Sequence, residues 1–147
     1  MSAPDLEFAR QWLRKAGNDL FTARCVLEHP DGPADTPCFH AQQAAEKSLK
    51  AVLTACGVRF GRGHDLIPLL DAAASRACGL AEYRAACAQL TAYAVGARYP
   101  EDMQEFTREE ATEALAWAAA IHAAAQRFLE GPASELTSAA DAGAEEE

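Results

Sequence analysis

The fold of this chain is decided by residues 39–53, which read FHAQQAAEKSLKAVL and have the pattern of an amphipathic helix. Gln42 points into the apolar stripe of that helix, and Glu46 lies at its edge. A half-buried carboxylate is costly unless a cation pairs with it, so we expect Glu46 to pair with Lys50 one turn later or with a cation from another helix. At 100° per residue the stripe itself consists of Ala45, Leu49, Val52, Leu53 and Cys56.

A basic loop follows this helix at residues 57–63, which read GVRFGRG, and leads to His64 and Asp65. Arg59, Arg62 and His64 in a glycine-rich segment suit an anionic ligand. The alternative is that His64 bonds to a backbone carbonyl and only fixes the loop. Asp65 is a good N-cap for the next helix.

The rest of the chain also favours helices. Alanine supplies 35 residues, whereas Val and Ile together supply six, so helices are well provided for and strands are not. Thr107 and Glu110 form a capping box at the start of the last helix. We therefore predict an all-α, up-and-down bundle of four long helices plus one short helix, at about 4–28, 35–56, 66–77, 80–97 and 107–131. The first helix should turn one side inward: Phe8, Trp12, Ala16, Leu20, Ala23 and Leu27.

Charge divides the chain into two parts. The formal net charge is −9, and residues 130–147 hold six acids and no base, so the remainder carries 16 acids against 13 bases. We expect one folded domain at 1–131 and a disordered acidic tail at 132–147. A nearly balanced body does not resemble a general nucleic-acid binder with one basic face, so phosphate contacts would depend on local basic groups.

The cysteines and the apolar runs indicate where the protein resides. The five cysteines are odd in number and contain no C-x-x-C pair, which argues against a disulfide framework and a zinc site. The longest wholly apolar run, residues 114–121, is too short to span a bilayer. We expect a cytoplasmic protein that does not enter the membrane.

Several common chemistries lack their motifs. No glutamate is followed by histidine at i+3, as ferritin-like metal sites require. The chain has no G-x-S-x-G and no phosphate-binding G-x4-G-K-[ST]. We therefore expect no metal and no cofactor.

Four motifs in order resemble the HEPN family, small helical proteins of prokaryotes that also occur as domains in higher eukaryotes. The first is QQAAEKSLKAVL at 42–53, and the second is GHDL at 63–66. Arg98-Tyr99-Pro100 resembles the R-Y-P that closes the family's penultimate long helix. The resemblance spans roughly residues 5–129 and includes a W-x3-A-x2-D-L-x2-A pattern in the first helix, at Trp12, Ala16, Asp19, Leu20 and Ala23.

The resemblance implies a nucleotide- or RNA-binding protein. It also implies a homodimer and a partner subunit of a small nucleotidyltransferase, often in a toxin–antitoxin pair. Arg98 can bind phosphate as a fork and Tyr99 can stack on a base, although Arg98 can equally neutralise the end of its helix or pair with an acid. The predicted ligand-binding residues are Arg98, Tyr99, His64, Arg59, Arg62, Glu46, Lys50 and Asp19.

Two alternatives remain open. Ribonuclease members of the family use an R-x4-6-H motif late in the chain, where arginine steadies phosphate and histidine acts in acid/base cleavage. No histidine follows Arg98 within six residues; Arg24 with His29 and Arg59 with His64 fit the letters, but chance alone predicts about one such match. The first alternative is therefore that the chain is an RNA endonuclease toxin with a degenerate R-x4-6-H motif. The other alternative is a structural dimerisation module whose inward polar residues fix the bundle register.

Overall fold

The computed structural model describes the backbone of residues 1–96 and 105–144 and the side chains of residues 1–94 and 105–131. These residues form helices and no strand, which confirms the all-α prediction. The elements are α1 (Ala3–Glu28), α2 (Asp35–Ala55), α3 (Leu66–Ala74), the 3-10 turn η1 (Ala81–Tyr83), α4 (Arg84–Gly96) and α5 (Arg108–Ala144).

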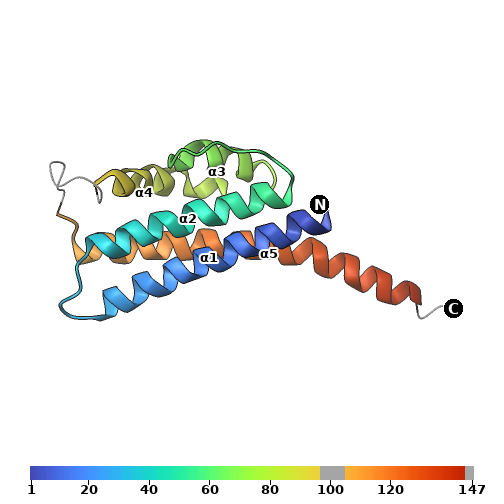
Figure 1. Ribbon diagram of the computed structural model, residues 1–147, viewed down its shortest axis with the longest axis horizontal. Coiled ribbons are helices and arrows are strands. Elements are labelled where there is room, and N and C mark those ends of the chain that lie inside the picture. Colours follow the sequence, from blue (N-terminus) through green and yellow to red (C-terminus); the bar gives the residue numbers. More distant parts are fainter. Residues whose placement is uncertain (97–104, 145–147) are drawn as a thin grey trace.

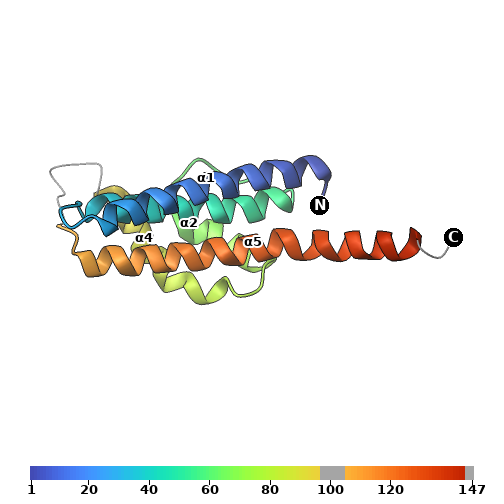
Figure 2. The ribbon, with the colours of Figure 1, turned by 90° about the horizontal axis from the view of Figure 1, so that it is seen from below.

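The long helices alternate in direction and α2 is central (Figure 1). Helix α2 contacts α1, α3, α4 and α5, while α1 and α5 also contact each other. In the view turned by 90°, α1 and α5 are two long rods that run along the molecule, with α1 at the top and α5 below it (Figure 2). The observed arrangement is the predicted up-and-down bundle.

Burial from several sides explains the composition of α2. Its alanines at 41, 44, 45, 51 and 55 are each 0% exposed, so neighbouring helices can approach closely. Leu49, Val52 and Leu53 fill the remaining core space. Gln42, Glu46 and Lys50 of α2 are also buried, so the interior of the bundle contains polar and charged side chains.

The inward face of α1 differs from the predicted one. Phe8 is 58% exposed, and Trp12 and Leu27 are only partly buried. The physical reason is that α1 packs against both α2 and α5, so its buried face is turned toward the line between those two helices. That face consists of Ala9, Leu13, Ala16, Asp19, Leu20 and Ala23.

The loop after α2 is set by the way that helix ends. Gly57 has φ 69°, a left-handed conformation that glycine adopts without strain. Its N–H donates to the Thr54 carbonyl and the Val58 N–H donates to the Leu53 carbonyl, which is a Schellman cap. Asp65 then caps α3 by accepting from the Ile67 N–H at 3.1 Å, as predicted. The loop 57–65 is thus fixed at both ends.

The short third helix and the fourth helix differ from the predicted ranges. Helix α3 ends at Ala74 rather than 77, and the 3-10 turn η1 precedes α4, which begins at Arg84 rather than 80. Gly79, at φ 86°, turns the chain between α3 and η1. The sequence pattern did not separate this turn from α4 because residues 81–83, which read AEY, contain no glycine or proline that would mark a break.

The last helix begins as predicted and continues further. The Thr107 N–H donates to Glu110 Oε1 at 3.3 Å and the Glu110 N–H donates to Thr107 Oγ1 at 3.1 Å, which confirms the capping box. Helix α5 does not end near Gly131 but runs to Ala144. Five of residues 133–144 are alanine, the strongest helix former, which outweighs the breaking effect of Gly131 and Pro132. The added turns extend beyond the ends of α1 and α2 in both views (Figures 1 and 2).

Candidate ligand-binding site

A row of polar side chains runs along the buried face of α2. Gln42, Glu46 and Lys50 are spaced by four residues, so their side chains lie one above another on the helix. As whole residues they are 0%, 4% and 9% exposed. The Lys50 Nζ lies 3.4 Å from Glu46 Oε2, which confirms the predicted pairing one turn later. Gln42 Nε2 lies 3.5 Å from Glu46 Oε1. No buried side-chain nitrogen or oxygen of the described residues lacks a hydrogen-bond partner, so each buried polar atom of the row has at least one partner.

The loop after α2 folds back onto this row through His64. The His64 Nδ1 lies 3.0 Å from Glu46 Oε1, and Gln42 Nε2 donates to the His64 carbonyl at 3.2 Å. The ring and the backbone of one loop residue are therefore both held by α2. The His64 side chain is 46% exposed, whereas that of Glu46 is 5% exposed. A buried carboxylate thus orients an imidazole that faces solvent, an arrangement that suits anion binding or proton transfer.

Lys50 is enclosed by aromatic rings. Its Nζ lies 5.4 Å from the ring centroid of Trp12 on α1 and 5.4 Å from that of Phe60 in the loop. The two rings meet edge to face with centroids 6.2 Å apart. Cation–π attraction and the ion pair to Glu46 compensate the charge of Lys50 as it is buried. Lys50 therefore holds Glu46 and the loop in place, and it offers little surface to a ligand.

Asp19 belongs to a second cluster, between α1 and α2. Its carboxylate accepts from Lys47 Nζ at 2.6 Å and lies 2.9 Å from His40 Nδ1. Asp19 of α1 therefore pairs with Lys47 and His40 of α2, two residues that the sequence pattern did not single out. His40 and Lys47 are seven residues apart, so they lie on the same face of α2, and that spacing is the signal that could have identified them.

The remaining predicted site residues divide into two groups. Arg59 and Arg62 are exposed on the same loop as His64. Arg98 and Tyr99 lie outside the described residues. The structure therefore brings together Glu46, Lys50 and His64, with two exposed arginines within five residues of His64 in the chain.

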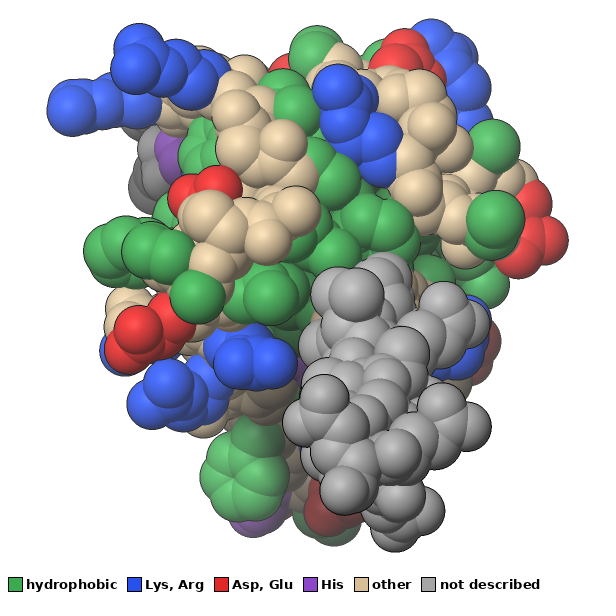
Figure 3. All heavy atoms as spheres, turned by 90° about the vertical axis from the view of Figure 1, so that its right-hand side faces the viewer, with side chains coloured by type: hydrophobic (Ala, Val, Ile, Leu, Met, Phe, Trp, Pro, Cys, Tyr) green, Lys and Arg blue, Asp and Glu red, His purple; other side chains and the backbone are tan. Residues whose placement is uncertain are grey.

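Positive charge is not gathered into one patch on the end of the bundle that Figure 3 shows. On the end of the bundle drawn in Figure 3, Lys and Arg side chains lie at separate places around a centre of hydrophobic side chains. This distribution agrees with the nearly balanced charge of residues 1–129. Any phosphate contact on this end must use a few local cations.

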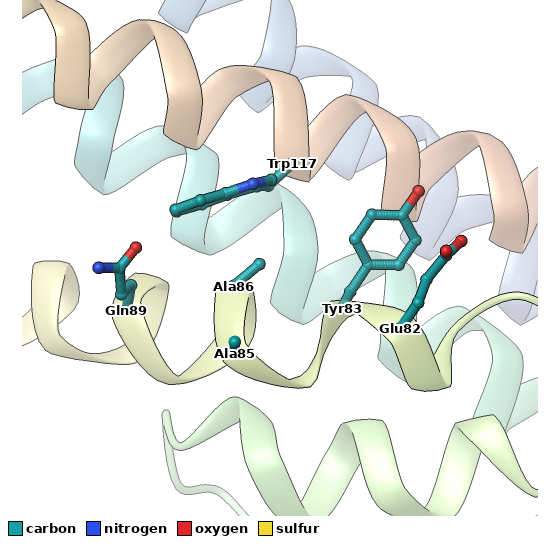
Figure 4. A pocket seen from close by; sticks show the side chains of 6 residues that line it. All are labelled: Glu82, Tyr83, Ala85, Ala86, Gln89 and Trp117. Carbon is teal, nitrogen blue, oxygen red and sulfur yellow. The ribbon is translucent and has the colours of Figure 1, made fainter.

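A pocket between α4 and α5 offers a different chemistry. Its volume is about 440 Å³, and Figure 4 shows Trp117 of α5 lying over Ala86 of α4, with Gln89 on one side and Tyr83 and Glu82 on the other. Glu82 is the only charged side chain among the described residues that line it. The pocket can accept a flat apolar group but provides no cation for phosphate.

Other classes of site receive no support from the described part of the chain. Within it, no three His, Cys, Asp or Glu side chains are grouped so that they could hold a metal ion. All five cysteines are free thiols. Among the same residues, every helix is too short or too polar to cross a membrane.

Comparison with known proteins identifies the family. The family model of the HEPN domain matches residues 9–128, which contain α2, α3 and α4, parts of α1 and α5, and the polar residues described above. No curated protein and no solved structure matches the chain. Because the family model covers most of its length, the chain belongs to the HEPN domain family.

Proposed function

We propose that this HEPN protein binds nucleotides or RNA through the loop 57–65, with His64, Arg59 and Arg62 as the phosphate contacts. The observation that carries the proposal is the hydrogen bond between the half-exposed His64 ring and the buried Glu46 carboxylate. Burying a carboxylate, a lysine and a glutamine is costly. In this protein the buried groups hold His64 in place, in a loop that also carries the exposed Arg59 and Arg62. A pre-positioned cationic loop loses little entropy when it binds an anion.

The proposal extends to partners. We propose that the chain forms a homodimer and acts as the partner subunit of a small nucleotidyltransferase in a toxin–antitoxin-like pair, located in the cytoplasm. Exposed hydrophobic side chains on α1 support association through this helix: Phe8 is 58% exposed, and Phe21, on a different side of the helix, is 68% exposed. Free thiols throughout support a reducing compartment. Sedimentation that shows only monomer at micromolar concentration would refute the dimer, and failure to copurify with a neighbouring-gene nucleotidyltransferase would refute the pairing.

The binding test uses salt dependence, because phosphate contacts release counterions. A labelled single-stranded RNA is titrated with wild type, Arg59→Gln and Arg62→Gln at several salt concentrations. Each substitution should lower the slope of log K against log salt by about 0.7. Arg127→Gln is the matched control, since Arg127 is also an exposed arginine and lies on α5. Equal slopes in all four proteins would dismiss the loop as the binding site.

A second candidate function, RNA cleavage, is favoured by the Glu46–His64 bond, because an oriented imidazole can act as a general acid or base. The same titration is run with an assay for RNA breakdown, with His64→Gln as the variant. RNA breakdown by wild type that His64→Gln abolishes, with RNA affinity retained, would favour the endonuclease. RNA binding without RNA breakdown supports the proposed function. If the protein neither binds nor cleaves RNA, the structural dimerisation module is the remaining alternative.

A further inference from the structure

A groove lies between α1 and α5, on a side of α1 different from the one where Trp12 meets the loop. Its volume is about 420 Å³, within the range of about 300–1,000 Å³ that small-molecule sites occupy. The described residues that line it combine two arginines, a histidine, two amides and two leucines: Arg10, Arg14, His122, Asn18, Gln126, Leu13 and Leu129, with Gly17 and Glu130.

The floor of the groove is apolar and its histidine is fixed. Leu13 is 8% exposed and Leu129 is 2% exposed. The Nε2 of His122 lies 3.2 Å from the Leu13 carbonyl oxygen, so Nε2–H donates to the backbone of the neighbouring helix. Gly17 contributes no side chain here, although glycine in the middle of a helix is unfavourable. Its missing side chain keeps the groove hollow next to the imidazole.

The charge of the groove is positive in a chain of net charge −9. Arg10 and Arg14 are exposed one helical turn apart, so their like charges disfavour each other. Neither forms an ion pair or a side-chain hydrogen bond with any residue whose side chain the structure describes. Glu130 is the only acid among the described lining residues. An anion placed between the two guanidinium groups would relieve their repulsion and accept forked hydrogen bonds.

We propose that this groove is a second ligand site, which binds a phosphate monoester of mononucleotide size. The phosphate lies between Arg10 and Arg14, and the uncharged part of the ligand covers Leu13 and Leu129. The amides of Asn18 and Gln126 hydrogen-bond to its polar edge. The volume limits the ligand to a small molecule, and the apolar floor distinguishes a phosphate ester from free phosphate.

The test follows backbone amide signals of the full chain by NMR while AMP, inorganic phosphate or adenosine is added. With AMP, shifts should gather at residues 10–18 and 122–130, and AMP should bind more tightly than either of the other two compounds. The double variant Arg10→Gln, Arg14→Gln should weaken AMP binding about a hundredfold, because each of the two lost charged hydrogen bonds is worth about a factor of ten. Arg24→Gln, an exposed arginine about 15 Å further along α1, should change nothing.

Gly17→Ala separates binding from stability. A methyl group there would lie 4.0 Å from His122 Nε2, an ordinary contact, so the variant should fold and its melting temperature should rise by about 2–4 °C. The same methyl group takes space from the groove, so AMP binding should weaken. The proposal is overturned if AMP causes no shifts in the groove up to about 10 mM, or if binding is unchanged in the double arginine variant.

Discussion

The Nδ1 of His64 lies 3.0 Å from Oε1 of Glu46, so a half-exposed loop histidine is hydrogen-bonded to a carboxylate that is 5% exposed. Glu46 also pairs with Lys50, whose side chain is 11% exposed. One carboxylate therefore serves two purposes, since it neutralises a buried ammonium and holds the loop 57–65. A change at Glu46 should affect stability and the proposed ligand site together.

Glu46→Gln should lower the free energy of unfolding by roughly 3 kcal/mol, because it leaves the buried Lys50 charge without its counter-ion. Urea unfolding measures the change. Asp71→Asn is the control, since it breaks the pair between Asp71 and Arg84, whose side chains are 54% and 63% exposed. Exposed pairs contribute about 0–1 kcal/mol. If Glu46→Gln loses less than about 0.5 kcal/mol, the buried row is not a stabilising network.

Asp19→Asn should cost less than Glu46→Gln. Its partners Lys47 and His40 are 23% and 26% exposed, so water can solvate them once the carboxylate is gone. We expect a loss of about 1–2 kcal/mol, measured in the same urea experiment. A loss larger than that of Glu46→Gln would show that the more buried ion pair is not the more stabilising one.

The sequence predicted the parts of this structure that depend on local spacing. The amphipathic period of residues 39–53, the Asp65 cap and the pairing of Glu46 with Lys50 each involve residues within a few turns of one helix. The partners of Asp19 depend on how α1 crosses α2, and the sequence contains no measure of that crossing. The contact between His64 and Glu46 likewise depends on the path of the loop after Gly57. That path depends on the geometry of the caps at both ends of the loop, which the sequence pattern alone does not give.

The groove between α1 and α5 was not predicted for the same reason. Arg10 and His122 are more than a hundred residues apart in the chain, and the helical period of either segment alone does not bring them together. Helix α1 turns the face with Leu13 toward the core and leaves Phe8 exposed. This orientation forms one wall of the groove, and it also explains why the predicted inward face was wrong.

Thr107→Ala should lower the free energy of unfolding by about 1 kcal/mol, because the Glu110 N–H loses its acceptor, Thr107 Oγ1, while the bond from the Thr107 N–H to Glu110 Oε1 does not need the threonine side chain. Thr112→Ala is the matched control within the same helix. The Thr112 hydroxyl donates to the Arg108 carbonyl four residues earlier, a bond that does not cap the helix, and alanine is the better helix former. Thermal unfolding should rank Thr112→Ala at or above wild type, and equal losses in both variants would contradict the cap.

Truncation after Gly131 should leave the melting temperature within about 2 °C of wild type. The last turns of α5, which runs to Ala144, extend past the ends of α1 and α2 (Figure 1), and the folded domain that we predict ends at residue 131. A helix without tertiary packing contributes little to stability. Calorimetry of the full and truncated chains tests this, and a large fall in melting temperature would show that the last residues dock onto the bundle.

Alkaline solution should destabilise the bundle through two core thiols. Burial raises the pKa of Cys38 and of Cys87 from 9.0 to about 12, and nearby negative charges add to the effect: Glu110 and Asp35 at Cys38, and Asp71 at Cys87. An unfolded chain loses these two protons near pH 9, whereas the folded chain keeps them until about pH 12. Above pH 9 the unfolded state therefore binds fewer protons, and the free energy of unfolding falls as pH rises, while below pH 9 this contribution is fully present.

The expected slope is up to roughly 1.4 kcal/mol per pH unit for each thiol. Urea unfolding between about pH 8 and 11 should therefore show a steeper loss of stability in wild type than in the double variant Cys38→Ala, Cys87→Ala. The double variant Cys25→Ala, Cys78→Ala is the control, since both of those thiols are exposed, and it should keep the wild-type slope. Because the comparison rests on slopes, a lower overall stability of either variant does not affect it. Equal slopes in all three proteins would mean that the core thiols ionise as readily in the folded chain as in the unfolded one.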